Sequence, residues 1–295
     1  MGKIPIVFTF DDRIILGASV AIKSLLNSAK SETSYDIYVL HNGISKKYLD
    51  ALSEIVPSPH SIQFKFIDKS VFKGVKKNRK SWTEIVYYRM IIPEVLQDLD
   101  KIIYSDVDVF FKDDLTEAFN TDISDFHWAG VRAERNLPSA IGHKYFPENK
   151  NEFIFWSGFM LINCKRCRDE KFFTKCMKTA FDFHDKLKFF DLDVLNIASD
   201  KIAPMPLKYC TLEALYALEN IEECRDLKYL KKVYSAAELA EAKNAPAIIH
   251  YAGQLGKPWH RKNPPSYYGE ILNSLPKILK KRTLRDLRKL LFSKK

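Results

Sequence analysis

Strand-like and helix-like segments alternate through the first hundred residues, and this order restricts the fold more than any other feature of the chain. Four short apolar segments with strand character are separated by three longer segments with helical character. The predicted strands are residues 4–10, 35–40, 61–67 and 101–104, and the predicted helices are residues 14–29, 45–56 and 83–96. This order is typical of a largely parallel sheet with helices on both faces. We therefore predict an α/β fold built on a single Rossmann-like, mixed and mainly parallel sheet, with Asp12 as the cap of the first helix.

The second half of the chain is less regular. Residues 153–162 are strongly apolar and aromatic, residues 247–251 resemble a short strand, and the predicted helices are residues 172–187, 193–198 and most of 267–291. No internal repeat and no change in composition requires a second domain. We predict one domain over residues 1–265, followed by a basic helical tail over residues 266–295.

Most of the net positive charge lies in this tail. The whole chain has a formal net charge of +10, and residues 277–295 contain nine Lys or Arg residues against one Asp. Leu284, Leu287 and Leu291 fall on one helical face among basic residues, namely Arg282, Arg285, Arg288 and Lys289. Such a pattern is typical of a helix that lies on an anionic membrane surface, although a plain solvated terminus has the same composition. A membrane surface is the predicted partner of the tail, and no nucleic acid is predicted as a partner.

The beginning of the chain and its cysteines bear on the cellular compartment. Met1 is followed by a strand-like segment without a basic and then apolar leader, and no apolar run approaches the ~20 residues of a membrane span. The cysteines are odd in number, and Cys164-x-x-Cys167 has no second pair to complete a structural zinc site. We predict free thiols and a cytoplasmic protein, peripheral on the inner face of the plasma membrane.

Asp106-Val107-Asp108 is the first candidate for chemistry. It directly follows the predicted strand of residues 101–104 and precedes a second apolar run. In extended backbone, residues two apart point to the same side, so both carboxylates can converge on one hard divalent cation such as Mn²⁺ or Mg²⁺. A lone D-x-D is more often a solvated turn, but the apolar residues on both sides make a surface turn an unsatisfactory explanation.

The segment from His250 to Trp259 is the second candidate. His250 ends an apolar run and is a possible third ligand of the same metal, and Lys257 is a possible phosphate contact. Gly253 allows the backbone to approach a ligand closely. The alternatives are a hydrogen-bonded core histidine and an ordinary surface loop.

Four further positions carry weaker signals. Asp11 closes the first strand, Arg89 lies on a predicted helix, Ser157 follows an aromatic strand, and Asp191 begins a predicted helix. A nucleoside, a phosphate or a sugar are possible ligands of these residues. An ion pair, core packing or a helix cap are the alternatives.

These motifs together resemble glycosyltransferase family 8, which includes bacterial lipopolysaccharide galactosyl- and glucosyltransferases and glycogenin. Six segments agree with the family in order and spacing, over about residues 4–260. They are Ile6–Asp12, Tyr88-Arg89, Tyr104–Asp108, Trp156–Asn163, Asp191–Asn196 and the segment from His250 to Trp259.

The resemblance implies a GT-A fold and transfer of galactose or glucose, with retention of configuration, from a UDP-hexose to a saccharide acceptor such as lipopolysaccharide. It implies Mn²⁺ or Mg²⁺ held by Asp106, Asp108 and His250, with Asp191 and Asp193 as candidate catalytic residues. The residues implied to contact the donor are Thr9, Asp11 and Arg13 at the uridine end, Arg89, Ser157, Asp191 and Leu192 near the sugar, and Gly253 and Lys257 at the diphosphate. Val107 is a further implied donor contact.

Two departures and two alternatives accompany this assignment. Leu192 stands where many bacterial members carry Gln, and the loop from Gly253 to Lys257 is one residue longer than usual. The D-x-D-x-Val pattern is also compatible with a haloacid dehalogenase-type phosphatase, in which Asp106 is the nucleophile, although that motif normally lies on the first strand. A non-catalytic protein that binds sugar nucleotides is the second alternative.

Overall fold

A seven-stranded mixed sheet forms the centre of the computed structural model, which describes residues 2–75, 83–139 and 145–292. Its strand order is β3-β2-β1-β4-β7-β6-β8, and the first four of these strands are parallel. β7 is antiparallel to both of its neighbours. The strands are β1 Ile4–Thr9, β2 Tyr35–His41, β3 Ser61–Phe66, β4 Lys101–Ser105, β6 Trp128–Arg135, β7 Phe153–Asn163 and β8 Ile202–Met205.

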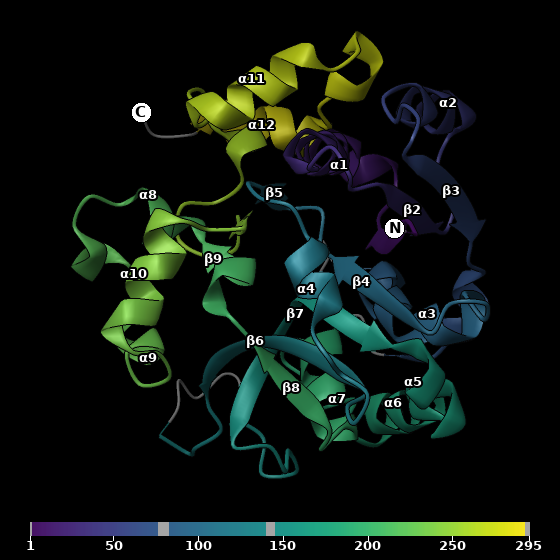
Figure 1. Ribbon diagram of the computed structural model, residues 1–295, viewed down its shortest axis with the longest axis vertical. Helices are drawn as coiled ribbons and strands as arrows, with labels where there is room; N and C mark the ends of the chain where they lie inside the picture. Colours follow the sequence, from purple (N-terminus) through teal and green to yellow (C-terminus); the bar gives the residue numbers. More distant parts are fainter. Residues whose placement is uncertain (1, 76–82, 140–144, 293–295) are drawn as a thin grey trace.

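The helices cover both faces of this sheet. Figure 1 shows α1 and α2 in its upper part and α5, α6 and α7 in its lower part, with strands between them. The α-helices are α1 Ile15–Ser28, α2 Lys46–Glu54, α3 Tyr88–Val95, α4 Thr116–Asn120, α5 Cys164–Asp169, α6 Phe172–Asp182, α7 Asp191–Ala198, α8 Glu213–Ala217, α9 Leu227–Leu230, α10 Ala236–Asn244, α11 Ser266–Ser274 and α12 Leu284–Phe292.

The side-chain alternation of the buried strands produces two hydrophobic cores. In β1, Ile6 and Phe8 pack into the core that contains α1 and α2, whereas Val7 packs into the core that contains α3, α5 and α6. Ile103 and Tyr104 of β4 divide in the same way. Because successive residues of a strand point to opposite faces, a continuous apolar strand requires a helical layer on each side. The predicted sheet with helices on both faces is therefore confirmed.

A second sheet was not predicted. It has three strands in the order β5-β10-β9, formed by Val109–Phe111, Ile248–His250 and Thr211–Leu212. β10 is antiparallel to β5, and the paired residues are 139 positions apart in the case of Ile249 and Phe110. Pairing over this sequence distance leaves no local pattern, so the sequence shows β5 only as an apolar run.

The first turn after β1 differs from the prediction. Asp11, not Asp12, accepts a hydrogen bond from a backbone amide at the start of this turn, the N–H of Arg13 at 2.9 Å. The carboxylate of Asp12 instead binds the amide and hydroxyl of Ser45, at the start of α2. The predicted cap of the first helix is therefore wrong, because Asp12 joins two helices.

The segment after residue 265 packs against the rest of the chain. Tyr268, Ile271 and Leu279 are buried members of the core that contains α1. The 3₁₀-helix η7 (Lys277–Lys280) contacts α1 and α2, and α12 contacts η6 (Pro258–His260). Figure 1 shows α11 and α12 in yellow beside α1. Lys294 and Lys295, which contribute to the predicted basic tail, lie outside the described residues. The same holds for four basic residues between the predicted strand of residues 61–67 and the predicted helix of residues 83–96, namely Lys76, Lys77, Arg79 and Lys80.

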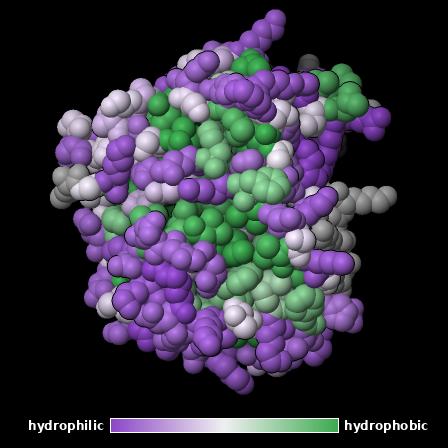
Figure 2. All heavy atoms as spheres, turned by 90° about the vertical axis from the view of Figure 1, so that its right-hand side faces the viewer, coloured by the Kyte–Doolittle hydropathy of each residue, from purple (hydrophilic) through white to green (hydrophobic). Residues whose placement is uncertain are grey.

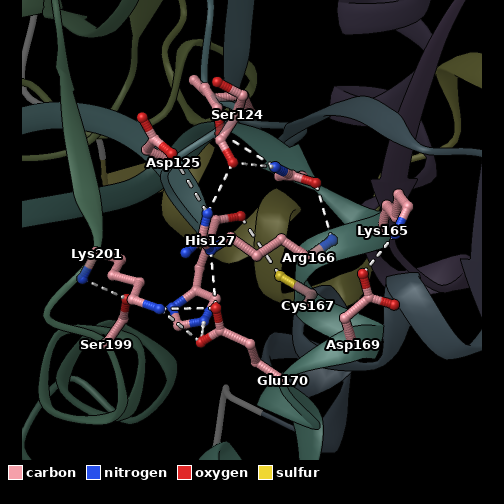
Figure 3. A network of polar contacts seen from close by, with 12 residues as sticks. Ser124, Asp125, His127, Lys165, Arg166, Cys167, Asp169, Glu170, Ser199 and Lys201 are labelled. Carbon is pink, nitrogen blue, oxygen red and sulfur yellow. Dashed lines mark hydrogen bonds and ion pairs between the residues drawn. The ribbon is translucent and has the colours of Figure 1, made fainter.

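A polar cluster centred on His127 joins three elements of the second half (Figure 3). The His127 ring contacts the Ser199 hydroxyl at 2.8 Å and the Glu170 carboxylate at 2.9 Å. Lys201 also donates to Glu170, at 2.7 Å, and the Cys167 thiol donates to the His127 carbonyl. Serine, histidine and carboxylate stand in series, which is the order of a serine nucleophile and its general base. Ser199 is only 2% exposed, however, so it is buried away from any substrate. The cluster therefore joins α5, β6 and the connection from α7 to β8.

The surface offers few other features. Figure 2 shows hydrophobic residues gathered across the middle of one face, with polar residues around them. Exposed apolar area of this kind is ordinary on folded proteins and carries no assignment here. All five cysteines are buried and unpaired. Among the described helices, none is both long and apolar enough to cross a bilayer.

Candidate functional site

One large cavity of about 870 Å³ opens at the carboxyl ends of β1 and β4. This edge of an α/β sheet is where ligands bind, because the chain leaves the strands there in loops that can diverge. Its lining includes every predicted site residue except Asp193, namely Thr9, Asp11, Arg13, Arg89, Asp106, Val107, Asp108, Ser157, Asp191, Leu192, His250, Gly253 and Lys257.

The pairing of β5 with β10 brings Asp106, Asp108 and His250 together. The three residues 106–108 connect β4 to β5, and His250 pairs with Val109 across the small sheet. The carbonyl of Asp108 accepts the amide of Tyr251 at 2.9 Å, which fixes this crossing. One ligand atom from each of Asp106, Asp108 and His250 lies within 4.8 Å of the others. The two carboxylates converge from a bend between strands, not from the extended backbone that was expected.

The donor set of this cluster fits a divalent cation. Two carboxylates and one imidazole nitrogen suit Mn²⁺, and the carboxylates also suit Mg²⁺. The Nδ1 of His250 lies 3.3 Å from the Cys210 sulfur, so Nε2 is the nitrogen that faces Asp108, also at 3.3 Å. Burial alone raises the pKa of Asp108, but Lys257 and His250 outweigh burial and hold this pKa well below its usual range. Asp108 is therefore an anion at neutral pH.

Gly158 of β7 leaves the space in which the cluster sits. Its carbonyl accepts the Asp106 amide at 2.8 Å, which places its Cα directly against the cluster. A Cβ on Gly158 would lie 2.7 Å from Cε1 of His250 and 3.1 Å from Oδ2 of Asp106. Distances this short require the His250 ring to move, so any side chain here would displace a predicted metal ligand.

Arg89 forms ion pairs with two acidic residues of the cavity. Its guanidinium contacts the Asp106 carboxylate at 2.8 Å and the Asp191 carboxylate at 3.2 Å, and it donates to the Ser157 carbonyl. Its side chain is only 6% exposed and lies over the Tyr104 ring. Burial alone would lower the pKa of Arg89, but Asp106 and Asp191 raise it, so Arg89 keeps its charge. It therefore orients both carboxylates in the wall of the cavity.

Another part of the cavity lining lies where β1 ends. Asp11 holds Arg13 through two hydrogen bonds, and the Arg13 guanidinium also donates to the Thr83 hydroxyl at 3.0 Å. Thr9 lies 3.2 Å from the Tyr104 hydroxyl, which donates to Asp106 at 2.8 Å. A continuous polar network therefore runs from Thr9 to the acidic cluster.

Lys257 reaches the cluster from a loop with two glycines in the left-handed region. Gly253 has φ +100° and Gly256 has φ +69°, conformations that residues with a Cβ rarely adopt. The fold of this loop directs the Lys257 ammonium to the Asp108 carboxylate and to the Tyr251 carbonyl. The longer loop thus still brings Lys257 to the predicted metal ligands.

Asp191 and Asp193 occupy different environments. Asp191 lines the cavity and accepts a hydrogen bond from the Ser157 hydroxyl at 2.8 Å, and burial raises its pKa to about 6. Asp193 is buried away from the cavity, where it accepts the amides of Lys188 and Phe189 at 2.6 and 2.7 Å. Residues two apart on a helix point in nearly opposite directions, which is why only one of the pair reaches the cavity. Leu192 lines the cavity with its apolar side chain.

One wall of the cavity, which was not predicted from the sequence, comes from the C-terminal segment. The lining residues of this wall are Trp259, His260, Thr283, Arg285, Asp286 and Lys289. Thr283 and Asp286 exchange hydrogen bonds at the start of α12: the side chain of each accepts the backbone amide of the other. This is the arrangement of a capping box, with Asp in place of Glu. That spacing was visible in the sequence, but only the fold places α12 at the cavity.

Comparisons with known proteins agree with this geometry. The family model described as glycosyl transferase family 8 matches residues 5–263. Glycosyltransferase GlyA of Streptococcus pneumoniae is 26% identical over 251 residues, which cover 83% of this chain and 32% of GlyA. Lipopolysaccharide 1,2-glucosyltransferase of Escherichia coli is 26% identical over 183 residues, which cover 61% of this chain and 50% of that enzyme. The chain therefore spans about a third to a half of the length of these two relatives.

Solved structures support the same relationship at the level of the fold. The galactosyltransferase LgtC, solved with donor and acceptor sugar analogs, superposes with a TM-score of 0.75 at 23% identity, covering 97% of this chain and 100% of that chain. This likeness shows the GT-A fold. The matched residues contain the D-x-D motif and the His250 segment, which removes the basis for the phosphatase alternative. The chain belongs to glycosyl transferase family 8.

Proposed function

We propose that this chain is a metal-dependent, retaining hexosyltransferase. It moves galactose or glucose from a UDP-sugar to a saccharide acceptor of lipopolysaccharide or another surface glycan. The observation that carries the proposal is the convergence of Asp106, Asp108 and His250 in the wall of the large cavity. The names of the Escherichia coli glucosyltransferase and of LgtC support a hexose donor and a saccharide acceptor.

Asp106, Asp108 and His250 would hold Mn²⁺ or Mg²⁺. A cation bound there stabilises the negative charge of a diphosphate leaving group. Lys257 is close enough to the same cluster to contact a phosphate as a point charge, once its ammonium leaves Asp108. Gly253 lets the loop backbone approach the diphosphate without a side chain in between.

The other residues position the two ends of the donor. Thr9, Asp11 and Arg13 provide a hydroxyl, a carboxylate and a guanidinium at the end assigned to uridine. Val107 lines the cavity between the metal ligands, and Arg89, Ser157 and Asp191 provide polar groups at the end assigned to the hexose. Holding a flexible donor at both ends places its glycosidic bond beside the metal ligands and lowers the entropic cost of reaction.

Retention by same-face attack agrees with the surroundings of the candidate nucleophiles. A covalent route needs a nucleophile in contact with the anomeric carbon. Leu192 has no nucleophilic atom, Asp193 is turned away from the cavity, and Asp191 is engaged by Arg89 and Ser157. We therefore favour attack by the acceptor from the side of the departing UDP, with a phosphate oxygen of UDP as the proton acceptor.

UDP release from a panel of UDP-sugars tests the proposed function. With Mn²⁺, UDP-glucose or UDP-galactose is expected to release UDP, and EDTA is expected to stop the reaction. Binding of a UDP-sugar without release would identify a non-catalytic binding protein, and release that persists in EDTA would contradict metal dependence. An α-linked product by NMR, with no glycosyl adduct in intact-mass spectra, is the expected evidence for same-face retention.

The exposed face of α12 supports the predicted membrane contact. Leu284, Leu287 and Leu291 are 78%, 44% and 73% exposed. These side chains form an apolar strip on a helix that carries several basic residues, which is the composition of interfacial helices. The anionic membrane surface proposed as a partner would therefore meet α12, with the protein at the inner face of the plasma membrane.

The Leu284→Ser/Leu291→Ser variant is expected to bind phosphatidylglycerol vesicles about a hundredfold more weakly, because each buried leucine contributes at least ~1.5 kcal/mol. UDP release in solution is expected to stay unchanged, since neither leucine lines the cavity. Vesicle sedimentation measures the binding. Leu137→Ser, at a leucine that is 48% exposed on another surface, is the matched control. Equal sedimentation of all three proteins would rule out this membrane contact.

A further inference from the structure

Helix α12 has two chemically different faces. Leu284, Leu287 and Leu291 point outward and are exposed, whereas Arg285 and Lys289, four residues apart, line the cavity. Side chains at this spacing lie one above the other on a helix, so both cations face the same space. The cavity therefore has a cationic wall that comes from a segment beyond the matched family region of residues 5–263.

The position of this wall is fixed by Asp286. Its carboxylate lies 2.7 Å from the Nε2 of His260 and accepts the amide and hydroxyl of Thr283 at 2.8 and 2.7 Å. Asp286 is buried, although its helix is largely exposed. Since Asp286 lies between the two cations in the sequence, its attachment to η6 holds Arg285 and Lys289 at the cavity.

Each of the other Lys and Arg side chains that line the cavity has an acidic partner. Arg13 pairs with Asp11, Arg89 with Asp106 and Asp191, and Lys257 with Asp108. Within residues 2–75, 83–139 and 145–292, neither Arg285 nor Lys289 has a carboxylate within ion-pair distance. Two unpaired cations on one wall of a concave site attract an anion.

The charges around Lys289 also favour an anion at this wall of the cavity. Burial, followed by the positive charges of Arg285 and Lys257, lowers the pKa of Lys289, whereas Asp286 raises it. Arg285, Lys289 and Lys257 line the same cavity, and Lys289 is repelled by the other two. An anion placed among them would relieve this repulsion, and phosphate suits both the guanidinium and the ammonium group.

We propose that Arg285 and Lys289 form an anion-binding pair that takes a phosphate group inside the cavity. The inference rests on the proposed function, which supplies a donor with a diphosphate. The phosphate has two possible sources, namely the diphosphate of the nucleotide and a phosphate carried by the acceptor sugar. In either case α12 both meets the membrane and completes the substrate site, so it acts as more than an anchor.

The Arg285→Gln/Lys289→Gln variant tests the pair in the full chain. Isothermal titration with Mn²⁺ present compares UDP with uridine, which lacks phosphate. Loss of two charged contacts is expected to weaken UDP binding roughly tenfold and to leave uridine binding unchanged. A second arm saturates the protein with UDP and Mn²⁺ and compares glucose 6-phosphate with glucose by saturation-transfer NMR. Lys165→Gln/Lys178→Gln, which removes two exposed lysines from α5 and α6, is the charge-matched control.

The outcomes separate the two sources and the two proposals. A loss confined to UDP assigns the pair to the donor diphosphate, and a loss confined to glucose 6-phosphate assigns it to a phosphate on the acceptor. Unchanged binding in both arms overturns the anion-binding pair. If the unaltered chain fails to bind UDP, the proposed function fails, and glucose 6-phosphate without UDP then decides the pair alone.

Discussion

Replacing Asp108 with Asn is expected to lower turnover of the UDP-sugar by about a thousandfold and to leave the fold intact. Asp108 is anionic at neutral pH, because Lys257 and His250 outweigh the effect of burial on its pKa. The amide keeps the size of the carboxylate but removes the charge that would hold a divalent cation. Turnover with Mn²⁺ and the midpoint of thermal unfolding are the two measurements.

Asp50→Asn is the matched control for this prediction. Asp50 is an exposed carboxylate of α2, paired with Lys46 one turn away, and it does not line the cavity. Its replacement removes the same charge and is expected to leave turnover unchanged. Normal turnover of Asp108→Asn, or of the unaltered protein in EDTA, would show that the cluster is not a catalytic metal site.

Gly158→Ala tests the same cluster through volume instead of charge. The added methyl group would lie 2.7 Å from Cε1 of His250, so the ring must leave its position in the cluster. Loss of Mn²⁺-dependent turnover is the expected result. Gly269→Ala on α11 makes the same chemical change where no atom lies within 4 Å, and it is expected to be harmless. Equal turnover of the two variants would contradict the structural argument.

Arg89→Ala is expected to lower the free energy of unfolding by roughly 3 kcal/mol at pH 8. Arg89 is buried between Asp106 and Asp191, so its removal leaves two carboxylates without their cation. Asp191 is the more deeply buried of the two, with a side chain that is 6% exposed. The uncompensated negative charge, more than the lost contacts, causes the expected destabilisation.

The pH dependence of this effect follows from Asp191. Burial raises its pKa to about 6 in the folded protein, above its unfolded value, so the folded state binds the proton more tightly. Stability from this group is therefore fully present below the unfolded pKa and is lost as the pH rises through about 6. Because Arg89 lowers this pKa, its removal extends the loss to higher pH. Arg89→Ala is thus expected to cost less stability at pH 5, where Asp191 can be protonated, than at pH 8.

Urea unfolding at the two pH values measures this difference. Arg13→Ala is the control, because Arg13 forms a comparable pair with Asp11 but its side chain is 53% exposed. Exposed pairs contribute less than about 1 kcal/mol, so this variant is expected to unfold nearly as the unaltered protein does. A pH-independent cost for Arg89→Ala would mean that Asp191 stays ionised throughout and that the argument from burial is wrong.

The local pattern of the sequence was sufficient for the parallel half of the fold. Strands β1, β2 and β4 are visible in the sequence as short, mostly apolar runs, because strands covered on both faces must be largely apolar. The position of Asp106 after such a run was also sufficient to predict a ligand at the sheet edge, since the carboxyl ends of parallel strands meet there. Asp193 shows the limit of this approach, because helical geometry turns it away from the residue two positions before it.

The sequence by itself determined which residue types stand at the ends of the strands, and therefore the chemistry that the site can hold. Only the tertiary structure decided which of them meet. The pairing of β5 with β10 sets His250 beside Asp108, and the attachment of Asp286 to His260 brings α12 to the cavity. Both contacts join distant segments whose partners are selected by packing of the whole chain, and no short-range periodicity encodes such a choice.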